Sequence, residues 1–496
     1  MRTRIIVTVA WMVVLFAPVG GAFANCFVPS TPNDGYFDQT WGGSGLGCVL
    51  FVGDNTDAAA SSALRKIVPA SDGGLVLGGY ATGVASDYWW LGKIDASGIF
   101  VPTFGDSDGS GRITECTLKA CGSLSFTDFA LQTDGKVSVL NKNYATRTTV
   151  DAHALDTTVA GGTGSVANGF TIGSPNGTLN ASDPTGSGIA IAPGGKTFAV
   201  GFGYPPGAVF ADFGIARLGS DLSVDTSFHA AAGSGITYAG GNFIAMVDSG
   251  LGARPAEASQ IFQMADGRLV LAASNGYHDI LIARLTSDGS LDTSFNSNGT
   301  HVVTSFPATL AYSATFSSHP ALVDRGGRVV FATYASKDGL YGPLLTRFNA
   351  DGTQDTSSPD QGYGAGWVFY NTFTACPNSG FQLSVDRPLA IDSAGRILIL
   401  GNCDSAFGVI RLRGDTLALD TSWGVNGMAH GHFDAASTSE EADVIAFDPA
   451  GHLFIGGATY PGGPPLKSAI ARLTYDLINT NNFEDTPPGC LPPNCN

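Results

Sequence analysis

The 496-residue chain has few charged residues, since Asp, Glu, Lys and Arg together make up 14% of it. Bases are scarcer than acids: 25 Lys and Arg stand against 42 Asp and Glu, for a net charge of −17. A chain this acidic is repelled by phosphate backbones and anionic membranes, so we expect no nucleic-acid partner. Long apolar runs are also missing after the first residues, which predicts no transmembrane segment in the mature chain.

The sequence also lacks the periodicity of a long amphipathic helix. Its apolar runs are short and are separated by turns, and glycine alone accounts for 67 residues. Short apolar runs between glycine-rich turns are typical of all-β proteins. The composition therefore predicts an all-β fold.

Residues 1–24 have the pattern of a secretory signal peptide. A basic start is followed by an apolar run at residues 5–19 and by the small-residue cleavage pattern Ala22–Ala24. We expect the mature chain to begin at Asn25 and to be exported, either to the extracellular space, to the cell surface or to the periplasm.

One motif recurs along the rest of the chain, and its clearest copy is Ala283–Phe295. The copies align on the Asp of a Leu-Asp-Thr step, with gaps of 55 to 69 residues between successive positions. These positions are Asp38, Val101 (a degenerate copy), Asp156, Asp225, Asp292, Asp355 and Asp420. A period of this size indicates a propeller or a solenoid.

A second marker is a glycine-centred turn between two apolar runs, which predicts a β-hairpin because the tight turn needs a positive φ. It occurs at Gly73, Gly135, Gly195, Gly267, Gly327, Gly395 and Gly451. Both markers therefore count seven units.

The two ends of the chain carry complementary halves of one unit. The last unit reaches Ala471–Leu473 without the Asp-Thr-Ser-Phe half, and residues 33–43 supply that half around Asp38. A unit split in this way favours a closed ring, in which an N-terminal strand completes the last blade. We predict a seven-bladed β-propeller over residues 25–485, with an eight-bladed ring or an open β-array as alternatives.

These motifs resemble the delta-60 repeat family of bacterial propeller-type proteins. The resemblance implies a secreted or surface β-propeller, and it supplies no catalytic residues. Residues 486–496 leave the repeat pattern and form a tail rich in proline and cysteine.

Eight cysteines in an exported chain predict disulfide bonds. They fall into pairs that are close in sequence, and this is the simplest of the 105 connectivities that eight cysteines allow. The predicted pairs are Cys26 with Cys48, Cys116 with Cys121, Cys376 with Cys403, and Cys490 with Cys495.

A basic residue recurs eight or nine positions before the repeat's Asp, at Lys93, Arg217, Arg284, Arg347 and Arg411. Such a set either forms a ring that binds anions or makes an ion pair within each blade. We favour the ion pair, and expect Arg284 to contact Asp292.

Residues 105–115 resemble a calcium loop, with oxygen-bearing side chains at alternate positions and a central glycine. The expected calcium ligands are Asp106, Asp108, Ser110 and the carbonyl of Arg112, with Glu115 as a substitute last ligand. The loop departs from the pattern because its twelfth position is Thr117, where a bidentate Glu belongs. An ordinary polar, glycine-rich turn is the alternative. Calcium is the one cofactor that the sequence suggests.

Trp90 and two histidines are the remaining candidates. Trp90 occupies a slot that is small or medium-sized in other units, so it is either a plug between blades or a platform that stacks on a ligand. His430 and His432 lie on one face of an expected strand and are candidates for a metal site or a channel lining.

Three functions are consistent with these observations. The first is a non-enzymatic scaffold that binds a protein or a glycan as a monomer, through loops such as 161–184, 233–255 and 362–387. The second is a hydrolase or lyase at the channel mouth, assisted by calcium. The third is a structural surface component. The candidate residues for the hydrolase or lyase are Asp106, Asp108, Glu115, His430 and His432. We favour the first.

Overall fold

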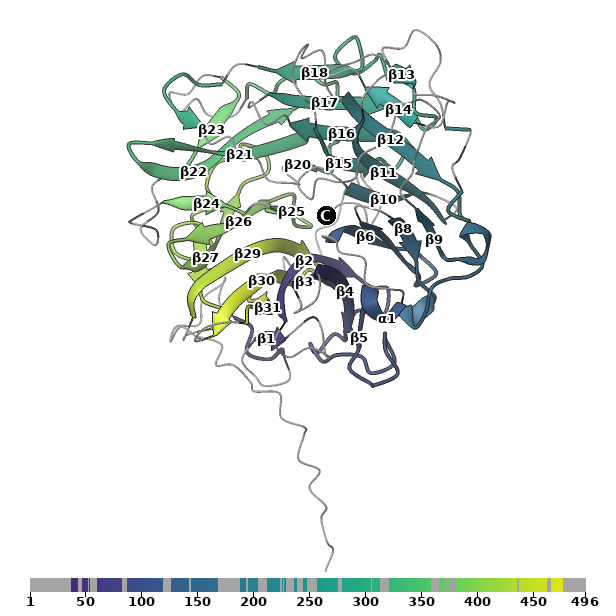
Figure 1. The fold of residues 1–496 in the computed structure, drawn as a ribbon. Helices are drawn as coiled ribbons and strands as arrows, with labels where there is room; N and C mark the ends of the chain where they lie inside the picture. The colour runs from purple at the N-terminus through teal and green to yellow at the C-terminus, as the bar shows by residue number, and fades with distance from the viewer. Residues whose placement is uncertain are drawn as a thin grey trace, which may run out of the picture.

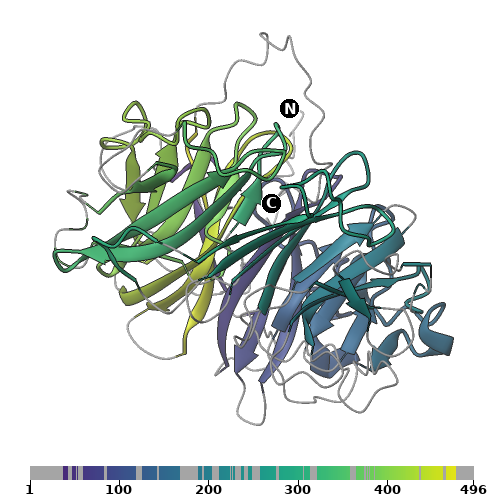
Figure 2. The ribbon, with the colours of Figure 1, turned by 90° about the horizontal axis from the view of Figure 1, so that it is seen from above.

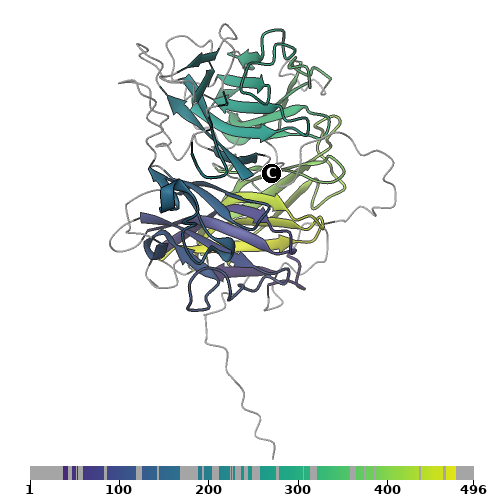
Figure 3. The same ribbon diagram turned by 90° about the vertical axis from the view of Figure 1, so that its right-hand side faces the viewer.

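The computed structural model describes most of residues 37–475, and its longest gaps are 168–187, 204–211, 248–256 and 313–320. It contains seven antiparallel sheets of four or five strands each, arranged in a ring (Figure 1). Views from above and from the side show that neighbouring sheets pack face to face around the ring (Figure 2 and Figure 3). The chain is a seven-bladed β-propeller, which confirms the count of units and excludes the eight-bladed ring and the open array.

Blades 1 to 4 follow the chain, each beginning with its innermost strand. Blade 1 contains β2 (Ser61–Pro69), β3 (Leu75–Thr82), β4 (Asp87–Ile94) and β5 (Arg112–Thr114). Blade 2 contains β6 (Phe126–Leu131), β7 (Val137–Asn141), β8 (Tyr144–Arg147) and β9 (Ser165–Ala167). Blade 3 contains β10 (Gly188–Ala192), β11 (Lys196–Gly203), β12 (Asp212–Leu218), β14 (Ile244–Val247) and β13 (Ile236–Tyr238). Blade 4 contains β15 (Glu257–Gln263), β16 (Leu269–Ser274), β17 (Ile280–Leu285) and β18 (Thr300–Val303).

Blades 5 to 7 complete the ring. Blade 5 contains β19 (Ala311–Tyr312), β20 (Ala321–Val323), β21 (Val329–Lys337), β22 (Leu340–Phe348) and β23 (Trp367–Phe369). Blade 6 contains β24 (Phe381–Leu383), β25 (Leu389–Ile391), β26 (Ile397–Cys403), β27 (Ala406–Leu412) and β28 (Met428–Gly431). Blade 7 contains β29 (Ser437–Phe447), β30 (Leu453–Pro461), β31 (Lys467–Leu473) and β1 (Cys48–Phe51). A short helix, α1 (Glu115–Leu118), follows β5, and 3-10 turns occur at Val150–Ala152 and Ala160–Gly162.

Blade 7 closes the ring with strands from both ends of the chain. β1 pairs with β31 in a register that places Cys48 opposite Ala471. Farther along the same edge, Asp38 makes an ion pair with Arg472 at 2.7 Å. The N-terminal segment thus supplies the outermost strand of the last blade, as the split unit predicts.

The glycine turns join the first and second strands of the blades, where a positive φ is required. The φ values are 83° at Gly73, 84° at Gly135, 72° at Gly195, 84° at Gly267, 75° at Gly327, 79° at Gly395 and 87° at Gly451. The seven predicted hairpins are confirmed.

Each blade packs on two neighbours, so the hydrophobic core lies between the sheets. One cluster joins β16 to β20 through Val270 and Val323, and every residue of β17 is buried. Strands buried on both faces read as continuous apolar runs rather than as alternating ones. No helix in the described part of the chain is long and apolar enough to cross a membrane.

One predicted disulfide lies wholly within the described residues, between Cys376 and Cys403, and is confirmed. Cys48 and Cys116 are also disulfide-bonded, to partners outside the described residues. The other predicted members, Cys26, Cys121, Cys490 and Cys495, lie outside the described residues as well.

Candidate functional site

The repeated basic residues lie on the third strand of each blade and pair with the repeat's aspartate. Arg284 Nε lies 2.7 Å from Asp292 Oδ2, which confirms the predicted contact. The same pair forms between Arg147 and Asp156, Arg217 and Asp225, Arg347 and Asp355, Arg411 and Asp420, and Arg472 and Asp38. Blade 1 has the degenerate copy Val101, and its Lys93 pairs instead with Asp72 at 2.6 Å.

The guanidinium groups also join one blade to the next. Arg217 donates to the carbonyl of Ser287 at 2.9 Å, and Arg284 donates to the carbonyl of Ala350. The same guanidinium groups lie over the aromatic ring that ends the motif, as Arg284 does over Phe295 at 4.9 Å. The motif therefore forms a joint between neighbouring blades, and its repeated charged residues have a structural role.

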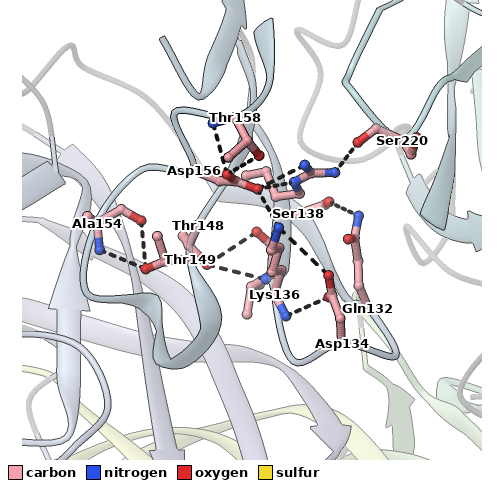
Figure 4. Close-up of polar contacts among 12 residues, drawn as sticks. Gln132, Asp134, Lys136, Ser138, Thr148, Thr149, Ala154, Asp156, Thr158 and Ser220 are labelled. Carbon is pink, nitrogen blue, oxygen red and sulfur yellow. Dashed lines mark hydrogen bonds and ion pairs between the residues drawn. The ribbon is translucent and has the colours of Figure 1, made fainter. Parts of the chain in front are cut away.

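The joint of blade 2 shows how the carboxylate is held (Figure 4). Asp156 accepts hydrogen bonds from Lys136 at 2.9 Å and from the Thr158 hydroxyl at 2.5 Å. Arg147 donates to the same carboxylate and to the carbonyl of Ser220 in blade 3. Burial opposes ionisation of Asp156, but these hydrogen bonds outweigh it and hold its pKa well below the usual range.

A different set of charges meets on the axis of the ring. Lys66 of β2, Asp128 of β6, Gln260 of β15 and Arg387 before β25 line a cavity of about 40 Å³. Lys66 Nζ lies 2.8 Å from Asp128 Oδ1, and Arg387 Nη2 lies 2.6 Å from the same oxygen. Asp128 Oδ2 accepts the backbone N–H of Ile189 at 2.8 Å. Polar groups from four blades thus converge at the centre of the ring.

Backbone bulges place these side chains. The register shifts between Leu64 and Lys66 in β2, and equivalent shifts occur next to Asp128 in β6 and Gln260 in β15. A bulge re-aims a side chain at a barrel or sheet rim. The neighbouring strand makes room with glycine, because a Cβ at Gly79 would lie 1.9 Å from the carbonyl oxygen of Ala63.

A second ion pair lies beside the first, between blades 1 and 7. Arg65 Nη1 lies 2.9 Å from Asp443 Oδ1, and Asp443 is only 2% exposed. Burial, with repulsion from Asp386 and Glu441, raises the pKa of Asp443 to about 7 in spite of Arg65. In the first pair, burial and the charge of Arg387 lower the pKa of Lys66 to about 8.

No sequence pattern predicted this axial cluster. Its signal is present in retrospect: charged residues interrupt the inner strands at Arg65, Lys66 and Asp128, and a Gly78–Gly79 pair lies in the next strand. Neither feature belongs to the repeat motif. Arg387 ends one of the long loops that were expected to carry binding residues, while most of the other two lies outside the described residues.

The expected calcium loop lies between β4 and β5, toward the outer edge of blade 1. The carbonyl of Arg112 accepts the N–H of Asp106 at 2.9 Å, and Asp108 Oδ1 accepts the N–H of Ser110 at 2.8 Å. Glu115 is buried at the start of α1. Within the described ranges, no group of three or more His, Cys, Asp or Glu side chains could hold a metal. Calcium binding at this loop stays a prediction.

Trp90 is fully buried between blades 7 and 1. Its ring meets Phe51 edge-on at 5.4 Å between centroids, and its indole N–H donates to the carbonyl of Tyr80 at 3.1 Å. This position is that of the inter-blade plug, and it leaves no exposed ring face on which a ligand would stack.

The two histidines lie at the outermost strand of blade 6. His430 is in β28, and His432 Nδ1 lies 3.7 Å from Glu440 Oε2. The neighbouring carboxylate of Glu440 raises the pKa of His432. Asp106, Asp108 and Glu115 belong to blade 1, so blade 7 separates them from the histidines. The structure does not bring the proposed catalytic candidates together.

The family model "Domain of unknown function (DUF5122) beta-propeller" matches residues 265–295 and 327–357. Each matched segment runs from a glycine turn to the repeat's aspartate in blade 4 or blade 5. The match supports a β-propeller family of unknown function. Comparison with the curated proteins finds no match.

Solved structures with a similar fold share little sequence with this chain. The PQQ-bound aldose sugar dehydrogenase from Streptomyces coelicolor is 15% identical, with 71% of this chain and 95% of that chain covered and a TM-score of 0.35. The Dos1 propeller is 10% identical, with 82% and 78% covered and a TM-score of 0.39. The AfRom2 CNH domain is 12% identical, with 86% and 99% covered and a TM-score of 0.39. Similarities this remote do not assign an activity, a cofactor or a partner to this chain.

Proposed function

We propose that the chain is an exported, non-enzymatic scaffold that binds a protein or a glycan. The observation that supports this most directly is the use of the repeated charged residues. The guanidinium of Arg284 contacts Asp292, the carbonyl of Ala350 and the ring of Phe295. Its counterparts Arg217 and Arg347 make the equivalent ion pairs in their own blades. A rigid ring of this kind is suited to presenting variable loops, which are the usual sites of recognition.

Export is supported by the leader pattern of residues 1–24 and by the Cys376–Cys403 disulfide. Disulfides persist in oxidising compartments and are rare in the cytosol. We also propose that the chain belongs to the delta-60 repeat family and that it is a monomer.

A thermal-unfolding screen of residues 25–496 against a glycan panel tests the binding proposal. A ligand at about 100 times its Kd adds about 2.7 kcal/mol to the free energy of unfolding, which raises the melting temperature measurably. We expect a shift with a restricted set of glycans and no chemical change in them. Hydrolysis or elimination of a panel member would favour the hydrolase or lyase instead. A flat response here and in a pull-down from the exported proteome would favour the structural component.

The same screen with calcium and a chelator tests the loop of blade 1. If Asp106 and Asp108 bind calcium, the metal raises the melting temperature and the chelator reverses the rise. An Asp108→Asn variant would then lose the response, while Asp338→Asn, in a hairpin of blade 5, would keep it. An unchanged melting temperature in calcium would contradict calcium binding at this loop.

A further inference from the structure

The axial cavity is rich in hydrogen-bond donors. Lys66 and Arg387 both reach Asp128, and Gln260 accepts the backbone N–H of Ala321 at 2.7 Å through its side-chain oxygen. The NH2 group of Gln260 and the Nε and Nη1 atoms of Arg387 donate no hydrogen bond to the described part of the chain. Both side chains line the cavity.

Acceptors at the cavity are already occupied. Asp128 Oδ1 accepts from Lys66 Nζ and from the N–H of Phe129, each at 2.8 Å, and Oδ2 accepts from Ile189. Arg387 Nη2, although close to Asp128, is buried without a hydrogen-bond partner among the described residues. A buried donor that lacks an acceptor costs free energy, so a ligand with acceptor oxygens is favoured there.

Charge and shape narrow the choice of ligand. Lys66 and Arg387 carry two positive charges and Asp128 one negative charge at the cavity. The carboxylate of Asp386 also acts on Lys66, but it lies in the adjoining pair, 3.9 Å from Arg65, and does not line the cavity. The rest of the cavity wall is apolar and includes Ile261. A cavity of about 40 Å³ has room for a few water molecules or for one small planar group.

We propose that this cavity binds a carboxylate group, held by the guanidinium of Arg387, the amide of Gln260 and the charge of Lys66. Arg presents a planar fork that matches a carboxylate, and the apolar wall covers the carbon to which the carboxylate is attached. This proposal rests on the scaffold function. It adds that a carboxylate is the chemical group through which an acidic ligand binds on the axis.

Acetate is the probe for this site, because it is a carboxylate with one small apolar group. Residues 25–496 are unfolded thermally over a range of sodium acetate concentrations, with sodium chloride at matched ionic strength as the reference. We expect the melting temperature to rise with acetate along a saturable curve and to stay flat in chloride. Binding of ¹³C-labelled acetate, followed by NMR line broadening, gives the same Kd without unfolding.

The variant Gln260→Glu separates a built site from a general salt effect. It keeps the oxygen that accepts from Ala321, so the fold is preserved, but it replaces the NH2 donor with a carboxylate. We expect the Kd for acetate to rise at least about tenfold, the loss of one charge-assisted hydrogen bond. Gln382→Glu makes the same change at an exposed position of β24 and is expected to leave the Kd unchanged.

Arg387→Lys is the second variant, since it keeps the charge and removes the fork; it too is expected to weaken acetate binding. Equal shifts in acetate and chloride, or an unchanged Kd in both variants, would overturn the carboxylate site and leave a water-filled cavity. Acetate binding involves no macromolecular partner. Its failure therefore leaves the scaffold proposal to its own glycan screen, and a flat glycan screen leaves the acetate result standing.

Discussion

Arg284 and Arg387 each make an ion pair with an aspartate, yet only Arg387 lies on the axis of the ring. Arg284 is 6% exposed, and its donors are used by Asp292, the carbonyl of Ala350 and the Ser294 hydroxyl. A side chain whose three nitrogens each donate a hydrogen bond within the frame contributes to stability. A side chain with donors left over beside a cavity is a candidate for binding.

Removing the Arg284 side chain tests its structural role. Arg284→Ala leaves the carboxylate of Asp292 with Arg268, at 3.2 Å, as its remaining basic partner, and partly buried charges that lose a partner are costly. We expect the free energy of unfolding to fall by about 3 kcal/mol, measured by chemical denaturation. The control is Arg325→Ala, on a turn of blade 5, which we expect to change stability by less than about 0.5 kcal/mol. Equal effects would contradict the joint.

The raised pKa of Asp443 predicts a pH dependence. Its folded-state pKa of about 7 lies above the ordinary pKa of an aspartate, so folding favours the protonated form. Its contribution is complete below the unfolded pKa and is lost as pH rises through about 7. Asp443→Asn, a neutral isostere, should remove this loss.

Between pH 5 and pH 8 the wild-type chain should therefore lose more than about 1 kcal/mol relative to Asp443→Asn, since one pKa unit corresponds to about 1.4 kcal/mol. Denaturation curves of both proteins across this range give the difference directly. Groups such as His432 titrate in both proteins and cancel. Parallel stability profiles would mean that Asp443 is ionised in the folded protein throughout this range.

At the scale of the strand, bulges and glycines act as pairs. β2 shifts register at Arg65 and β29 shifts at Asp443, and the next strands carry Gly79 and Gly457 opposite the displaced carbonyls. A Cβ at Gly457 would lie 1.8 Å from the carbonyl oxygen of Glu441. The glycines allow the inner strands to turn charged side chains toward the axis.

Gly79→Ala should disturb the axial cluster through the backbone. The added Cβ would lie 1.9 Å from the carbonyl oxygen of Ala63, so β2 must move. We expect a loss of about 1–3 kcal/mol, typical of overpacking, with weaker acetate binding at the cavity lined by Lys66. Gly326→Ala is the control, because its Cβ would meet only side-chain atoms, Asp324 Oδ1 at 3.3 Å and Arg328 Nε at 3.7 Å. A stable Gly79→Ala variant with unchanged binding would show that the bulge does not depend on glycine.

At the scale of the whole molecule, a backbone link between neighbouring blades recurs around the ring and is also present where the ring closes. Backbone hydrogen bonds link successive blades, among them Gly105 to Asp151 at 2.7 Å and Gly42 to Ser97 at 3.0 Å. The second of these crosses from the N-terminal segment of blade 7 to blade 1. The closure therefore uses the same kind of backbone link as the joint between blades 1 and 2.

Equivalent tryptophans test whether the closure is as strong as the other joints. Trp41 is 1% exposed and packs edge-on against Phe454 at 5.4 Å, while Trp423 is fully buried beneath Arg411. We expect Trp41→Ala and Trp423→Ala to lower the free energy of unfolding by similar amounts, about 3–5 kcal/mol, by chemical denaturation. A much smaller effect at Trp41 would indicate a ring that opens easily at its ends.

The number of blades, the closure and the joints were predictable because they depend on local signals that repeat. A glycine at a turn needs a positive φ wherever it occurs, and Arg284 reaches Asp292 across a short hairpin. The complementary half-units around Asp38 and Ala471–Leu473 determined that the ring closes. These features follow from the sequence alone, since each involves residues close in the chain or a pattern counted along it.

Only the tertiary structure decided what lies on the axis. Lys66 and Asp128 are 62 residues apart, and Arg387 reaches them from the far side of the ring. Their meeting depends on strand bulges and on the closure of seven sheets, neither of which has a local pattern. The same reason separated Asp106 from His430: residues whose chemistry suggested a shared site lie on different blades, because position in the ring determines which side chains meet.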